Sequence, residues 1–288
     1  MSRTLVGNDY LVEHTFYAAD EETATDVTGV GTVTVTREDG TVLAGGTTTD
    51  TGVGTTTFPL TAAVHTTRVD DLTIGYSATV AGRTVSEYEY VKVVGARFFS
   101  IALLRAQKGL SNTVVYANAD LKWARDVAED FVEEFTKDAF VPQYRRDIFD
   151  GDDGSEMFLS RIGVRSIIGV TIDGVAASTT GWSVSASGRV RTDGDIFTSN
   201  VTAGQNITVS YSLGRNAPPA NLANATVKLA RHLLLSLESS IPDRARMMTT
   251  EFASYQLDVA SEDKPTGIPE IDAVLSRYRA AQGDWIVA

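Results

Sequence analysis

The stretch from Asn206 to Leu237 constrains the fold of this chain more than any other part of its sequence. Ile207, Val209 and Tyr211 alternate with Thr208 and Ser210, which is the period-two pattern of a strand with one buried face. A pair of prolines then ends the strand, because proline cannot donate to a sheet and is favoured in the first turn of a helix. The following helix carries two apolar rows, formed by Leu222, Thr226, Leu229, Leu233 and Leu237 and by Ala223, Val227, Ala230 and Leu234. A helix this apolar must be covered on several sides, by a domain core, a subunit interface or both.

The first 96 residues predict an all-β domain. Val33 and Val35 alternate with threonines, the sequence at 38–40 forms a hairpin turn, and Ala81-Gly82 joins two further strands. Short strands rich in Thr and Val, without a helical period, indicate an immunoglobulin-like or fibronectin-like β-sandwich. The cysteine pair of immunoglobulin domains is absent, so this prediction concerns the architecture and not a family.

The remainder of the chain mixes helices and strands. Apolar residues at helical spacing predict helices over 98–107, from about 120 to 140, and over 269–281. Strand candidates joined by Gly/Asp turns lie at 145–149, 158–162, 167–172, 182–185 and 190–191. We therefore expect an α+β chain of two domains. Residues 1–96 form the sandwich, residues 97–282 form a helical domain with an inserted β-meander, and residues 283–288 form a C-terminal tail.

The composition excludes several kinds of function. The 288 residues include no cysteine, which rules out disulfides, thiolate metal sites and cysteine nucleophiles. The formal net charge of −12 argues against nucleic-acid binding, because that affinity comes largely from counterions released by basic residues. No apolar run is long enough for a membrane span, and the first residues lack the pattern of a secretory signal.

Candidate catalytic and metal-binding patterns are weak. The acidic run at 150–156 suggests a calcium loop, but it departs from the EF-hand pattern and a solvated turn is favoured. The three histidines lie in unrelated segments, and no nucleophile elbow or phosphate-binding glycine loop is present. Paired carboxylates for glycoside hydrolysis remain open as a minor alternative. We expect no catalysis, no metal and no cofactor.

The helix predicted from about 120 to 140 has a strongly acidic side. Its acidic residues are Asp126, Glu129, Asp130, Glu133 and Glu134. An ordinary solvated face is the favoured interpretation. The alternative is that this side lines a passage through which DNA travels without sticking, because like charges repel.

Over residues 97–282 the chain carries, in this order, the segments LLRAQ, DLKWARDVAEDFVEEFTKDAFVP, ITVSYSLG, APPANLANATVKLARHLL, IPDRA and TGIPEIDAVLSRYR. In their order and spacing these segments resemble the head-to-tail connector, or adaptor (head-completion), proteins of long-tailed bacteriophages, most of all those of actinobacterial phages. It implies a structural virion protein at the head-tail interface, present in the host cytoplasm during assembly. The protein would form a ring, dodecameric by analogy to the portal, between the portal and the next connector, stopper or tail protein. Genomic double-stranded DNA would pass through this ring without sequence-specific binding.

The resemblance also suggests roles for individual residues. The ring interface is expected to involve Lys228, Leu229, Arg231 and Leu233 on the apolar helix. Trp285, Ile286 and Val287 of the tail are expected to dock into the portal, since tryptophan is a common anchor in protein contacts. The channel lining is expected to include Glu129, Asp130, Glu133 and Glu134.

The N-terminal β domain is a departure from the minimal members of this family. The resemblance therefore says nothing about its partner. An alternative to the adaptor is an oligomeric surface-binding module, in which the sandwich recognises a glycan or a host protein and the rest of the chain assembles it.

Overall fold

The structure is a computed structural model, and it describes residues 2–17, 23–25, 27, 31–192, 197, 204–237, 247–249, 254–256 and 264–279. The chain divides into two compact units, each made from two separate pieces of sequence. The first unit comprises residues 1–96 and 141–216, and the second comprises residues 97–140 and 217–288. Strands dominate the first unit and helices the second, so the predicted α+β class with two domains is confirmed.

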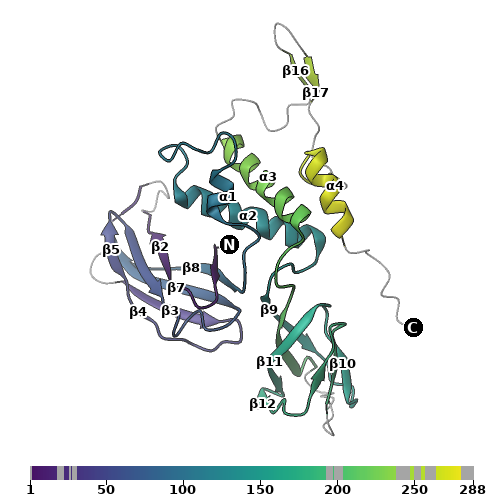
Figure 1. Cartoon of the computed structure of the whole chain (residues 1–288). Coiled ribbons are helices and arrows are strands. Elements are labelled where there is room, and N and C mark those ends of the chain that lie inside the picture. The colour runs from purple at the N-terminus through teal and green to yellow at the C-terminus, as the bar shows by residue number, and fades with distance from the viewer. Residues whose placement is uncertain are drawn as a thin grey trace. The chain divides into compact units, whose positions relative to one another are not determined.

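The N-terminal part of the first unit is a β-sandwich (Figure 1). One sheet has the order β1-β8-β7-β3-β4 and the other has the order β2-β6-β5. The strands are β1 (Ser2–Leu5), β2 (Tyr10–Thr15), β3 (Thr32–Arg37), β4 (Gly46–Thr47), β5 (Thr49–Gly52), β6 (Thr55–Leu60), β7 (Asp70–Val80) and β8 (Arg83–Val94). Val12 and Leu60 of the smaller sheet share one core with Val35, Ile74 and Val91 of the larger sheet. The predicted sandwich is thereby confirmed.

The long hairpin of β7 and β8 follows directly from local sequence. Alternate residues of β7 are buried, as the period-two pattern predicts. Ala81 and Gly82 both adopt positive φ, at 49° and 77°, which is the backbone of a two-residue hairpin turn. Strands β1 and β2 were missed by the sequence analysis. Strand β1 pairs in parallel with β8, a partner that lies at the far end of the domain in sequence.

Two small sheets form the rest of the first unit. Their strands are β9 (Gln143–Phe149), β10 (Glu156–Phe158), β11 (Val164–Ile172), β12 (Val175–Ala177), β13 (Ser183–Val184), β14 (Arg189–Arg191) and β15 (Ile207–Leu213). They are ordered β12-β11-β15-β9 and β10-β14-β13. Strand β15 lies inside the larger of these sheets, between its antiparallel partners β9 and β11, and its Ile207, Val209 and Tyr211 are buried. The predicted strands are present, but their order is not that of a simple meander, because β15 lies between β9 and β11; we keep the name meander for residues 143–213.

Asp147 of β9 is a buried hydrogen-bonding centre within the meander. Its carboxylate accepts hydrogen bonds from Tyr211 Oη at 2.7 Å, from Ser160 Oγ at 2.8 Å and from the Ser160 backbone N–H at 2.9 Å. The Nε of Arg145 lies 3.4 Å from the same carboxylate. Burial raises the pKa of Tyr211, so its hydroxyl remains a donor. These contacts tie the β10–β11 connection to two strands of the sheet.

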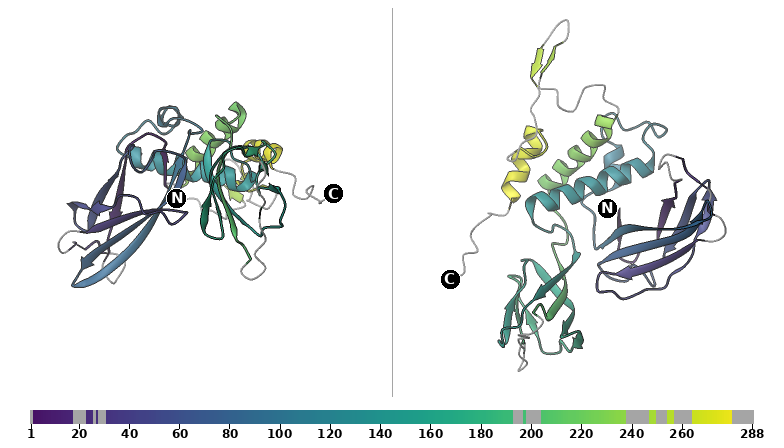
Figure 2. Two further views of the ribbon diagram at one scale, coloured as in Figure 1. Left: turned by 90° about the horizontal axis from the view of Figure 1, so that it is seen from below. Right: turned by 180° about the vertical axis from the view of Figure 1, so that it is seen from behind.

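The second unit consists of helices α1 (Ile101–Arg105), α2 (Asn118–Thr136), α3 (Ala220–Leu237) and α4 (Pro269–Tyr278), with a small hairpin of β16 (Met247–Thr249) and β17 (Ser254–Gln256). Helices α2 and α3 lie side by side, and α4 packs against both (Figures 1 and 2). On α3, Leu222, Thr226 and Ala230 are fully buried, as its two apolar rows predict. Helix α1 is shorter than predicted because it begins after Ser100, whose hydroxyl accepts from Leu103 N–H at 3.2 Å.

The chain leaves and re-enters the first unit at one point. The Gly95 N–H donates to the Pro142 carbonyl at 2.7 Å, and a Cβ at position 95 would lie 2.7 Å from the proline ring. Glycine is therefore required for this close approach. The predicted domain boundaries at residues 96 and 282 remain predictions. In the structure, the meander belongs to the same compact unit as the sandwich, and the helices form the other unit.

Candidate functional site

The acidic residues of α2 form a buried charge cluster within the helical unit. Glu129 is 0% exposed, and its carboxylate accepts from the Phe98 backbone N–H at 2.9 Å. The guanidinium Nη1 of Arg97 lies 2.7 Å from Asp126 and 3.5 Å from Glu129. Arg125 Nε lies 3.3 Å from the same Asp126 carboxylate. The cluster fixes the chain entering α1 onto the middle of α2.

This cluster corrects the interpretation of α2 as a solvated acidic face. Asp126, Glu129 and Glu133 are buried, and Arg97 and the Phe98 N–H compensate the charges of Asp126 and Glu129. Buried carboxylates do not face a solvent-filled passage, so Glu129 and Glu133 do not fit the expected channel lining within this protomer. Asp130 is half-buried and Glu134 is exposed, and for these two the channel role stays a prediction.

The expected ring-interface residues on α3 have partners inside the helical unit. Lys228 forms an ion pair with Glu270 of α4, and both side chains are exposed. Arg231 donates from Nε to the Lys108 carbonyl at 2.7 Å. Leu229 is buried and Leu233 is half-buried. Helix α3 is thus covered largely by its own unit, and its role in a ring stays a prediction.

Sequence analysis missed a group of exposed apolar residues earlier in the helical unit. They are Leu103 on α1, Val114 and Val115 in the following connection, and Trp123 on α2. Trp123 is 47% exposed and Val114 is 91% exposed. Periodicity could have identified Trp123, because it falls outside the apolar row of Leu121, Ala124 and Ala128. Tryptophan is enriched among the residues that dominate binding energy, so Trp123 is a candidate contact residue.

The tail residues Trp285, Ile286 and Val287 lie outside the described part of the chain. Their expected docking into a portal therefore stays a prediction based on the sequence.

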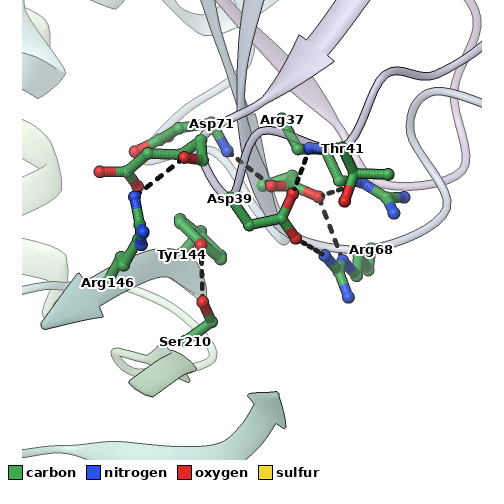
Figure 3. A network of polar contacts seen from close by, with 10 residues as sticks. Arg37, Asp39, Thr41, Arg68, Asp71, Tyr144, Arg146 and Ser210 are labelled. Carbon is green, nitrogen blue, oxygen red and sulfur yellow. Dashed lines mark hydrogen bonds and ion pairs between the residues drawn. The ribbon is translucent and has the colours of Figure 1, made fainter. Parts of the chain in front are cut away.

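A polar network occupies the start of β7 and reaches β9 (Figure 3). Asp70 is buried beside the guanidinium groups of Arg37 at 2.7 Å and Arg68 at 3.1 Å. Arg146 of β9 donates to the Glu38 carbonyl at 3.1 Å. Tyr144 and Ser210 share a hydroxyl hydrogen bond of 2.8 Å, and burial raises the pKa of Tyr144 to about 12. The network joins the sandwich to the meander within the first unit.

Burial dominates the protonation of two acids in this network. It raises the pKa of Asp71 to about 7, although the Lys92 cation opposes the shift from the facing position on β8. It also raises the pKa of Asp70, against the opposing effect of Arg68 and Arg37. Asp39 behaves oppositely. Burial would raise its pKa, but hydrogen bonds from Thr41 and the charges of Arg68 and Arg37 outweigh burial and lower it.

We expect Asp71→Asn to stabilise the protein at pH 8. An acid whose folded pKa exceeds its unfolded value gives stability below the unfolded pKa, and that stability is lost as pH rises through the folded pKa. For Asp71 the loss falls between about pH 4 and the folded value of about 7. The variant should therefore unfold with a free energy about 1–3 kcal/mol higher at pH 8, and this gain should shrink towards pH 5. Urea denaturation at the two pH values measures it.

Asp39→Asn is the matched control for Asp71→Asn. Because the folded pKa of Asp39 is lowered, its carboxylate stabilises the protein above its unfolded pKa, and the amide should reduce stability at pH 8. If both variants shifted the unfolding midpoint in the same direction at pH 8, the desolvation of Asp71 would not be the dominant effect.

The other polar patterns have structural partners. In the acidic run, Asp152 accepts from the Gly154 N–H at 2.9 Å, and Glu156 is held by Arg189 through two hydrogen bonds of 2.9 and 2.5 Å. His14 Nε2 lies 3.0 Å from Glu87, and burial lowers the pKa of His14. Over the described ranges, no group of three or more potential metal-ligating side chains comes together. Nor is any helix in the described part of the chain long and apolar enough to cross a membrane.

Comparisons with known proteins gave matches only among solved structures. No protein-family profile matches the chain, and neither does any curated protein. One chain from the neck of an empty GTA particle computed with C6 symmetry is 17% identical, with a TM-score of 0.43, over 64% of this chain and 91% of that chain. A chain in the virion of a native gene transfer agent (GTA) particle gives the same values. A chain from the neck of a native GTA particle computed with C12 symmetry is 15% identical, with a TM-score of 0.39, over 66% of this chain and 96% of that chain.

Proposed function

We propose that this chain is a structural virion protein, a ring-forming adaptor between the portal and the tail or next connector protein. The observation that carries the proposal is the order of motifs over residues 97–282, which resembles that of phage head-to-tail connectors. The helices that bear these motifs pack into a single unit, although the meander separates α2 from α3 in sequence.

The exposed apolar residues of α1, the α1–α2 connection and α2 supply a surface for the neighbouring copy. A cyclic ring needs a head-to-tail contact, in which one surface of each subunit meets a different surface of the next. Trp123 is suited to the centre of such a contact, because tryptophan is enriched among residues that dominate binding energy. Leu233, Leu229, Lys228 and Arg231 remain the proposed contribution of α3.

We expect Trp123→Ser to impair assembly without unfolding the protomer. Truncating a central aromatic anchor costs about 2 kcal/mol or more of contact energy, which weakens each subunit contact by roughly thirtyfold. Because the side chain is 47% exposed, the free energy of unfolding should change much less. Size-exclusion chromatography with light scattering, on the chain alone and mixed with its portal protein, measures the assembled mass.

Phe158→Ser is the control, since Phe158 is a large apolar side chain in the meander that is 66% exposed, more than Trp123. It should leave the assembled mass unchanged. If Trp123→Ser assembled as the unmodified chain does, Trp123 would not belong to a subunit contact. If the unmodified chain stayed monomeric both alone and with portal, the adaptor proposal itself would be contradicted.

The ring would also contact the portal on one side and the tail or next connector protein on the other. The tail with Trp285, Ile286 and Val287 would dock into the portal, and a stopper or tail protein would bind on the opposite side. The lumen would carry Asp130 and Glu134, which repel the phosphates of passing DNA at short range. The protein would act in the virion after assembly in the host cytoplasm, with no enzymatic role.

A further inference from the structure

On the outer face of the larger sandwich sheet, strands β3, β7 and β8 form an uncharged grid composed mainly of hydroxyl and tyrosine side chains. Directly opposed residues on neighbouring strands place their side chains on one face of a sheet. The register of β3, β7 and β8 therefore defines three rows, Thr32-Ser77-Ser86, Thr34-Gly75-Tyr88 and Thr36-Thr73-Tyr90. None of these nine residues carries a charge, although the chain as a whole has a net charge of −12.

The acidic residues adjacent in sequence point away from this face. Glu87 and Glu89 alternate with the two tyrosines on β8, so they belong to the opposite side of the sheet. Glu87 lies 3.0 Å from His14 of the other sheet, and Glu89 accepts from Ser2 Oγ at 3.0 Å. The first charged pair on the face itself is Asp71 opposite Lys92, one row beyond Thr73 and Tyr90. The surface around the two tyrosines is therefore uncharged, because the neighbouring glutamates lie on the other face of the sheet.

The two tyrosines are exposed and well placed for stacking. Tyr88 is 67% exposed and Tyr90 is 55% exposed. The ring of Tyr88 lies against Gly75, where an added Cβ would approach the ring carbon Cε1 to 3.1 Å. Because residue 75 is glycine and has no side chain, the Tyr88 ring can lie directly over the β7 backbone. Alternate residues of a strand are separated by about 7 Å and lie on the same face, so Tyr88 and Tyr90 are neighbours on the grid.

We propose that this grid binds an uncharged polysaccharide. The C–H faces of sugar rings stack on aromatic rings, and Tyr88 and Tyr90 present two such rings side by side. Serine and threonine hydroxyls both donate and accept hydrogen bonds, as sugar hydroxyls require, and Thr32, Thr34 and Ser86 are exposed around the rings. A charged polymer would find no counter-charge on the grid. This proposal concerns the N-terminal β-sandwich and does not depend on the ring.

Affinity electrophoresis of the full chain in native gels tests the proposal. The gels contain a soluble uncharged glucan, galactan, mannan or arabinan, and a heparin gel serves as the charged comparison. We expect at least one uncharged polymer to retard the chain. The double variant Tyr88→Ala/Tyr90→Ala should lose at least about tenfold in affinity for that polymer. The double variant Tyr88→Phe/Tyr90→Phe retains both rings and should keep most of the binding.

Tyr17→Ala is the control, because Tyr17 is an exposed tyrosine of the same domain outside the grid. It should migrate as the unmodified chain does, and all variants should melt normally because the replaced side chains are exposed. The proposal is overturned if no uncharged polymer retards the chain, if only heparin does, or if the alanine double variant binds equally well. If no polysaccharide bound, and the unmodified chain self-associated while the alanine double variant did not, the face would instead be a contact between copies of the chain. Ring assembly is measured separately, so either proposal can fail alone.

Discussion

Replacing Glu129 with alanine is expected to lower the free energy of unfolding of the helical unit by about 3–5 kcal/mol. The side chain is fully buried on α2, where it accepts from the Phe98 N–H at 2.9 Å and lies 3.5 Å from Arg97 Nη1. Alanine would remove the acceptor of a buried backbone group and part of the charge that compensates a buried guanidinium. Both losses add to the cost of the cavity.

Glu134→Ala provides the comparison on the same helix. Glu134 is exposed, so its removal should change stability by about 0.5 kcal/mol or less. Glu129→Gln should give an intermediate loss, since the amide oxygen can still accept from Phe98 while the charge is gone. Unfolding in urea is best followed by hydrogen exchange of helical amides, because a chain of two units need not unfold in one step. Similar losses for Glu129→Ala and Glu134→Ala would contradict the buried cluster.

Replacing Asp147 with alanine should produce the second large effect, a loss of about 2–4 kcal/mol in the first unit. Three donors would lose their acceptor at once, namely Tyr211 Oη and the backbone and hydroxyl groups of Ser160. Because Asp147 is buried, water cannot readily replace the carboxylate. Hydrogen exchange of the β9 and β15 amides, which pair with each other, reports this loss directly.

A double-mutant cycle separates the Asp147 interactions. Tyr211→Phe removes one of the three donors and should cost about 1 kcal/mol, and the combined variant should cost less than the sum of the two single variants. Asp152→Ala is the control, since Asp152 accepts a turn N–H at an exposed position. Additive losses for Asp147→Ala and Tyr211→Phe would show that the 2.7 Å contact is not energetically important.

The regular elements could be predicted where burial follows a short period. Strand β15 and helix α3 were anticipated because Ile207, Val209 and Tyr211, and then Leu222, Thr226 and Ala230, repeat at the spacing of their own secondary structure. Helix α4 and the β7–β8 hairpin were found for the same reason. Strand β1 escaped detection because its four residues have no alternation of their own and depend on pairing with β8.

The buried charges could not be predicted, because their partners are distant in sequence. Periodicity assigns Asp126, Glu129 and Glu133 to a polar side of α2, and polar sides are usually solvated. Arg97 and the Phe98 N–H reverse that expectation, but they lie before α1, and only the folded helical unit brings them to α2. The outer grid of the sandwich was equally hidden, since it depends on the register of three strands. Trp123 was also missed, although it could have been predicted as an apolar residue outside the buried row of Leu121, Ala124 and Ala128.

The interleaved order of the two units affects how the chain folds during synthesis. Helices α1 and α2 leave the ribosome before the entire meander, while α3, which covers them, comes afterwards. At a translation rate of about 5–20 residues per second, the apolar sides of α1 and α2 and the buried acids of α2 stay uncovered by α3 for roughly 4–17 seconds. The sandwich strands β1 to β8 are all synthesised before α1. The interval before α3 emerges is therefore the time in which the nascent helical unit is most prone to aggregate.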